Sequence, residues 1–268
     1  MAAGFTALVL ATNAAGQTGW TSPRVLGLLA LALVLVAAFC VLSSRSERPL
    51  IRIRIFADRT YTLSVVYVVL IQAVVLALGY LIPYYAQVSA SMGSFAAGCL
   101  LLPGCVLGAC LTPLGGRVLD RLGPARPILA GAVCGVLAMA LFAAVGVDVP
   151  APWLALVYVI MPVCQGLSVS NSMTNGLRSL PDRLQADGNA AFNTIQQLGG
   201  AVGTAVATAV VNAAQSAGSD DLAAATRSGT HTGFVVLLVL TVLALAAATS
   251  VFVSRGADRR AARGARRG

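Results

Sequence analysis

Residues 115–126 read Gly115-Gly116-Arg117-Val118-Leu119-Asp120-Arg121-Leu122-Gly123-Pro124-Ala125-Arg126, and they separate two long apolar segments at 95–114 and 126–146. Glycines permit the tight turns and positive φ angles that a short connection between helices requires. The carboxylate of Asp120 can pair with an arginine or lie near a helix N-terminus, where an anion is stabilised by up to about 1 kcal/mol. The stretch therefore predicts a short loop that acts as a hinge between two membrane helices. An ordinary charged turn is the alternative that this spacing leaves open.

The composition of the whole chain predicts a membrane protein. Of its 268 residues, 58% are hydrophobic and 10% are charged, whereas soluble domains are nearer half apolar and a quarter charged. A helix needs about 20 apolar residues to cross a bilayer. Seven runs are long enough, at 25–42, 62–83, 95–114, 126–146, 153–172, 190–213 and 232–253. None shows the strict alternation of a membrane β-strand, so we expect an all-α integral membrane bundle. The apolar stretch 1–12 is too short to span and is interpreted as the end of a partial leading helix.

The arginines set the expected orientation. All eighteen basic residues are arginines, and sixteen of them lie on one side of the membrane if the stretch 43–61 is cytoplasmic. Such a bias is what the positive-inside rule describes. We therefore expect a multi-pass protein of the cell membrane with a cytoplasmic C-terminus. The basic tail 254–268 is expected to lie against anionic headgroups, and no nucleic-acid partner is expected.

Polar residues at membrane depth are neutral. No acidic residue, arginine or histidine lies in the middle of a predicted span, although an ionisable group there is the usual sign of a proton relay. We expect a substrate cavity to be lined by five amide side chains: Gln72, Asn171, Asn193, Gln196 and Gln197. Hydrogen bonds that join helices are the alternative interpretation. Gly199 and Gly203 are spaced to let their helix approach a neighbour closely.

Four separated parts of the chain resemble the major facilitator superfamily, in its branch of drug:proton antiporters with 14 helices. The stretch 116–126 is similar to the signature loop G-x-x-x-D-R-x-G-x-x-R of that family, and the matching residues are Gly116, Asp120, Arg121, Gly123 and Arg126. The segments 80–103 and 186–205 and the linker 46–56 resemble other parts of that branch in the right order. The chain departs from the family at 124–125, where arginines are frequent.

This resemblance implies a map of the chain. Residues 62–253 would be the C-terminal six-helix half of a major-facilitator-type bundle. Residues 1–61 would hold a partial central helix, one full linker helix and a basic cytoplasmic linker, and 254–268 a basic tail. The resemblance also implies a missing N-terminal six-helix half as partner, which usually carries the proton-coupling carboxylates.

The function implied is export of amphiphilic organic compounds by proton antiport, at a site near the bilayer midplane between two halves. The signature loop would bias one conformational state. A truncated or accessory membrane protein without transport activity of its own is the alternative, and the lack of buried charge favours it. An enzyme is not expected, because the sequence shows no nucleophile–base pair, metal-ligand cluster or phosphate-cradling loop. We expect no cofactor and no metal; the expected partners are the lipid bilayer and a small organic substrate.

Overall fold

The structure is a computed structural model that describes residues 53–146, 150–217 and 221–264, the last eleven by their backbone alone, with isolated positions between residues 6 and 35. Every element in the described ranges is helical. Six helices are long and apolar enough to cross a membrane, which confirms the predicted helical membrane fold. Half of the predicted span 25–42 and most of the stretch 1–12 lie outside the described residues.

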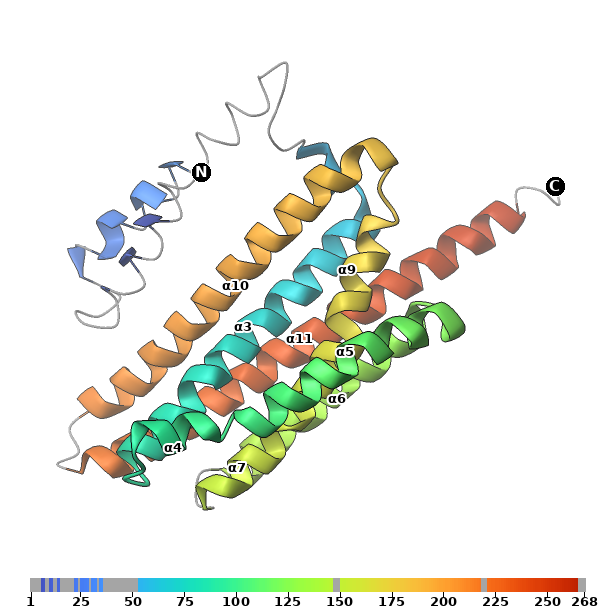
Figure 1. The fold of residues 1–268 in the computed structure, drawn as a ribbon. Helices are drawn as coiled ribbons and strands as arrows, with labels where there is room; N and C mark the ends of the chain where they lie inside the picture. The colour runs from blue at the N-terminus through green and yellow to red at the C-terminus, as the bar shows by residue number, and fades with distance from the viewer. Residues whose placement is uncertain are drawn as a thin grey trace.

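The six spans correspond to the predicted segments from 62 to 253. In chain order they are α3 (Arg59–Val88), α4 with α5 (Ser94–Cys99 and Leu102–Leu122), α6 (Ala125–Val145), a broken helix made of α7 to α9, α10 (Asp182–Ser216) and α11 (Leu222–Gly264). A 3-10 helix, η1 (Ile53–Ala57), leads into α3. Figure 1 shows η1 and the α5–α6 and α9–α10 turns at one end of the bundle, with α4 and α7 at the other.

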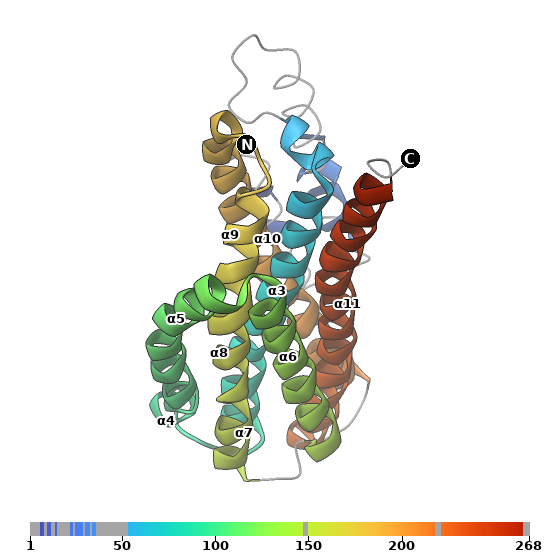
Figure 2. The ribbon, with the colours of Figure 1, turned by 90° about the vertical axis from the view of Figure 1, so that its right-hand side faces the viewer.

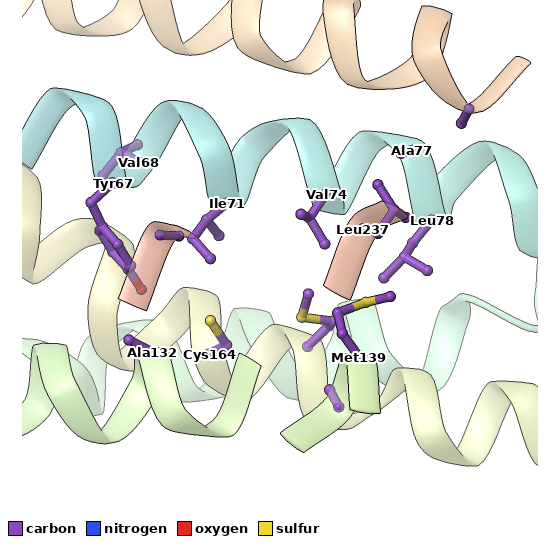
Figure 3. Packing of buried hydrophobic residues seen from close by; sticks show 14 of the residues in the cluster. Tyr67, Val68, Ile71, Val74, Ala77, Leu78, Ala132, Met139, Cys164 and Leu237 are labelled. Carbon is purple, nitrogen blue, oxygen red and sulfur yellow. The ribbon is translucent and has the colours of Figure 1, made fainter. Parts of the chain in front are cut away.

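Helix α3 is the central element of the bundle. It packs most extensively on α10 and α11, and α11 in turn packs on α6. Figure 3 shows side chains such as Ile71 on α3, Met139 on α6 and Leu237 on α11 gathered in one apolar cluster. Phe142 and Phe234 join α6 to α11 with ring centroids 4.9 Å apart. Because lipid is as apolar as these side chains, such van der Waals packing has to hold the helices together.

Two glycines bring α10 against the backbone of α3. A Cβ atom at Gly199 would lie 2.7 Å from Val69 Cγ1 and 2.8 Å from the Val69 carbonyl oxygen. A Cβ atom at Gly203 would overlap the backbone of Ala73. The Gly199-x-x-x-Gly203 spacing therefore lies on the contact face, where only hydrogen atoms fit.

The stretch that the sequence assigns to a loop is mostly helical, so that prediction is wrong in its extent. Helix α5 continues through Leu122, and the turn to α6 consists of Gly123 and Pro124. Leu119 and Gly115 are buried against the rest of the bundle, which explains why the helix does not stop earlier. Gly123 has a φ of 74°, a conformation that favours glycine.

The fourth span is broken rather than continuous as the sequence predicts. It consists of α7 (Ala151–Tyr158), α8 (Ile160–Cys164), a π-helical turn η2 (Gln165–Val169) and α9 (Ser170–Leu177). A π-turn widens the helix and frees backbone carbonyls. Ser168 Oγ donates to the Cys164 carbonyl at 2.5 Å, and Asn171 Nδ2 donates to the Leu167 carbonyl at 2.7 Å. Side chains of the broken helix thus satisfy its own backbone. Figure 2 shows this span, with α7, α8 and α9 labelled, between α5 and α6.

Candidate functional site

Helices α3 and α10 form a hydrogen-bonded pair along most of their length. One bond lies near each end of the pair and one near its middle: Tyr61 Oη to the Gly188 carbonyl at 2.7 Å, Gln196 Nε2 to Gln72 Oε1 at 3.0 Å, and Gln215 Nε2 to Tyr84 Oη at 3.1 Å. Between them lie the glycine contacts described above. The three bonds fix the register of α10 on α3 and make the pair a single body.

Four of the five predicted cavity residues lie on this pair. We call Gln72, Asn193, Gln196 and Gln197 the amide face. Gln72 and Gln196 are half-buried, and Asn193 and Gln197 are exposed. Asn193 Nδ2 donates to the carbonyl and to Oδ1 of Asn189 at 2.9 and 3.1 Å. An exposed amide against lipid tails is unfavourable because nothing there can form hydrogen bonds with it, so this face is suited to water, a ligand or another protein.

Other surfaces of α10 differ from the amide face. Val202 is 43% exposed and presents a purely apolar side chain, as lipid requires. Thr204 and Thr208 donate their hydroxyls to backbone carbonyls one turn earlier, at 3.1 and 2.8 Å. The hydrogen-bonding capacity of α10 at depth therefore comes mainly from its amides.

Asn171, the fifth predicted cavity residue, lies apart from the amide face. Its side chain is 2% exposed, and besides its bond to Leu167 its Nδ2 donates to the Gly115 carbonyl at 3.1 Å. That bond ties α9 to α5. The position matches the alternative interpretation, in which an amide joins two helices.

Sequence reasoning missed a buried polar contact between α3 and the π-turn. Tyr67 Oη donates to Ser168 Oγ at 2.5 Å, and both side chains are fully buried. Ser168 also lies under Gly131 of α6, where a Cβ atom would be 2.7 Å from Ser168 Cβ. The two bonded residues are 101 positions apart, and no spacing rule along one helix could pair them.

The signature residues lie around the α5–α6 turn. Asp120 and Arg121 are exposed on the last turn of α5, and Arg126 is exposed on the first turn of α6. The structure shows no ion pair for Asp120 within the described residues. The arginine partner expected for Asp120 is therefore not found among these residues. Asp120 lies in the last turn of α5, where the dipole of that helix disfavours an anion by about 0.3–1 kcal/mol. A Cβ atom at Gly116 would meet open space.

Charged groups in the described part of the chain lie near helix ends and leave the middle of the spans neutral. The aspartates whose side chains the structure describes are Asp58, Asp120, Asp182, Asp187 and Asp221. Within the same residues, no group of three or more His, Cys, Asp or Glu is placed to hold a metal ion. The chemistry that the amide face offers is therefore neutral hydrogen bonding.

Comparison with known proteins gives consistent matches. The model of the Major Facilitator Superfamily matches residues 1–204. A lincomycin resistance protein, LmrB of Listeria monocytogenes, is 30% identical over 90% of this chain and 53% of its own length. A putative multidrug resistance protein, MdtD of Pectobacterium atrosepticum, is 24% identical over 94% of this chain and 53% of its own length. An uncharacterized MFS-type transporter, YhcA of Bacillus subtilis, is 30% identical over 75% of this chain and 38% of its own length. The chain spans about half the length, or less, of these curated relatives.

Proposed function

This chain belongs to the major facilitator superfamily, and on that premise we propose that it forms one six-helix half of an exporter for amphiphilic organic compounds. The amide face is the observation that carries the proposal. It puts hydrogen-bonding groups at membrane depth on a surface that is unfavourable against lipid. Relatives named for resistance to lincomycin or to several drugs support outward transport of small organic molecules.

In the proposed mechanism, substrate binds between the amide face and a second six-helix half, and the halves rock about it. The hydrogen-bonded α3–α10 pair moves as one body. Helix α5 is less buried in this half than α3: three residues of α5 are buried, against fourteen of α3. Asp120 and Arg121 at the end of α5 bias one state through a partner group outside the described residues.

We further propose that export is driven by protons entering through carboxylates of the other half. The described spans of this chain carry no aspartate, glutamate, arginine or histidine at mid-depth that could relay a proton. The end of the bundle that holds η1 and the α5–α6 and α9–α10 turns faces the cytoplasm in this proposal, because most of the arginines lie there.

An accessory membrane protein without its own transport activity is the second candidate. One observation favours it: the neutral middle of the described spans. In that case the amide face would be a contact surface for another membrane protein.

Drug tolerance in a host that lacks its own exporters separates the two candidates. The chain is expressed alone and with the coding region that adjoins it, and lincomycin tolerance and ethidium accumulation are measured with and without a protonophore. We expect protonophore-sensitive tolerance in the form that supplies both halves, and its loss in the Gln72→Leu/Gln196→Leu variant. The matched control is Val202→Leu on an apolar surface of α10. Tolerance that survives the double leucine variant would contradict the assignment of the amide face.

A further inference from the structure

Exposed arginines gather at one end of the bundle. Among the residues whose side chains the structure describes they are Arg54, Arg59, Arg117, Arg121, Arg126, Arg178 and Arg183, all exposed and none in an ion pair with a described acid. The opposite end carries one described arginine, Arg227. Seven guanidinium groups, each with five N–H donors, are thus left for a partner.

Arg59 and Arg178 flank a single hydrogen-bonded junction, and Arg54 and Arg183 lie four residues from it along the chain. Ser179 Oγ donates to Asp58 Oδ1 at 2.7 Å, which ties the α9–α10 turn to the start of α3. Arg59 and Arg178 are the chain neighbours of the two bonded residues, so their backbones are held side by side. Figure 1 shows η1 and the start of α10 together at this end.

We call Arg54, Arg59, Arg178 and Arg183 the basic cluster. Arg54 precedes the junction on η1, and Arg183 lies in the first turn of α10. Three acids lie beside the cluster along the chain: Asp58, Asp182 and Asp187. Asp58 Oδ1 also accepts from the Tyr61 backbone N–H at 2.7 Å, and Asp182 Oδ1 accepts from Gln185 at 3.2 Å. Four guanidinium groups against three carboxylates leave this region a positive excess of one charge.

We propose that the basic cluster binds the phosphate of an anionic phospholipid headgroup. The spanning helices begin at Arg59 and Asp182 and one ends at Leu177, which sets the cluster at the level of the headgroups. The planar fork of arginine matches two phosphate oxygens at once. Basic residues between helix ends on the cytoplasmic side are suited to anionic lipids of that leaflet.

The site has a consequence beyond substrate export. It lies on the rigid α3–α10 pair, away from the amide face, and it does not require the α5–α6 turn. A lipid bound there fixes this end of the pair to the membrane surface. Its occupancy depends on the anionic lipid content of the bilayer and not on any exported compound.

Lipid retention on the purified full chain tests the proposal. The chain is placed in nanodiscs of phosphatidylcholine with increasing phosphatidylglycerol, and bound lipid is counted by native mass spectrometry. We expect preferential retention of phosphatidylglycerol. The Arg59→Gln/Arg178→Gln variant is expected to weaken it by about fivefold for each arginine removed. The matched control, Arg117→Gln/Arg121→Gln, removes the same charge at the same end outside the cluster and is expected to retain the lipid.

A second variant separates the site from a folding defect. The Arg59→Lys/Arg178→Lys variant keeps both charges but loses both planar guanidinium groups. We expect it to retain less phosphatidylglycerol than the wild type and more than the glutamine variant. Glycerol phosphate in solution is expected not to displace the lipid, because the acyl chains hold it at the cluster. Equal losses in the two glutamine variants, or equal retention of the two lipids by the wild type, would overturn the proposal.

Discussion

Replacing Gly203 by alanine should separate α10 from α3. The new Cβ atom would lie 2.5 Å from both the Cα and the carbonyl carbon of Ala73, whereas ordinary contact begins at 3.4 Å. The carbonyl oxygen of Ala73 would lie closer still. The backbones must therefore move apart by at least about 0.9 Å, the difference between 3.4 and 2.5 Å. A rigid shift of that size would take the 3.0 Å Gln196–Gln72 bond beyond hydrogen-bonding range.

The expected loss in the free energy of unfolding combines three contributions. Overpacking of this kind costs about 1–3 kcal/mol, and the lost hydrogen bond costs about 1 kcal/mol. Alanine recovers up to about 1 kcal/mol through its higher helix propensity. We expect a net loss of about 1–3 kcal/mol.

Unfolding of the purified protein by SDS in mixed micelles, followed by circular dichroism, measures this loss. The matched control is Gly79→Ala on α3, because a Cβ atom there would meet nothing within 4 Å. The control should be neutral or slightly stabilising. If Gly203→Ala unfolds at the same SDS fraction as Gly79→Ala, the close contact between the two backbones is not as described.

Three further variants test other parts of the account. Gly123→Ala should lower the free energy of unfolding by about 1–3 kcal/mol in the same assay, because the φ of 74° is strained for alanine. The control Gly116→Ala should leave that free energy unchanged, because its Cβ atom meets open space. Equal effects of the two variants would refute the strain at Gly123. Ser168→Ala leaves the buried Tyr67 hydroxyl without its acceptor and should lower the free energy of unfolding by about 1–3 kcal/mol. An unchanged free energy of unfolding would contradict that hydrogen bond. Asp120→Asn should slow efflux in a form that supplies both halves while leaving SDS unfolding unchanged; an unaltered efflux rate would remove the proposed gating role.

Much of the fold follows from the sequence because lipid imposes simple limits. A run of about 20 apolar residues has to be a helix when no water can satisfy its backbone, and six such runs became the six described spans. The glycine pair 199–203 also lies where its spacing predicts, on the face toward α3.

The errors arise where tertiary contacts decide the local structure. Helix α5 continues past Gly115 and Gly116 because Leu119 is buried, which no turn signal at residue 115 can reveal. The π-turn at 165–169 depends on Ser168 and Asn171 satisfying carbonyls, and serine and asparagine are common at depth without any such turn.

The candidate site could be predicted only in part for the same reason. The sequence identifies Gln72 and Gln196 as polar residues at depth, but their bond joins positions 124 apart and depends on the register of two helices. Asn171 belongs to the same residue type, yet the structure buries it against α5. Amide chemistry alone does not separate a residue that faces a cavity from one that joins helices.

The most direct test of the amide face is its access to water. In a background without the native cysteines, Gln197→Cys and Val202→Cys are introduced separately in the full chain and treated in membranes with a membrane-impermeant thiol reagent. We predict that Cys at position 197 reacts and that Cys at position 202, on an apolar surface of the same helix, does not. Reaction at 202 with protection at 197 would contradict the claim that the amides of α3 and α10 line an aqueous substrate path.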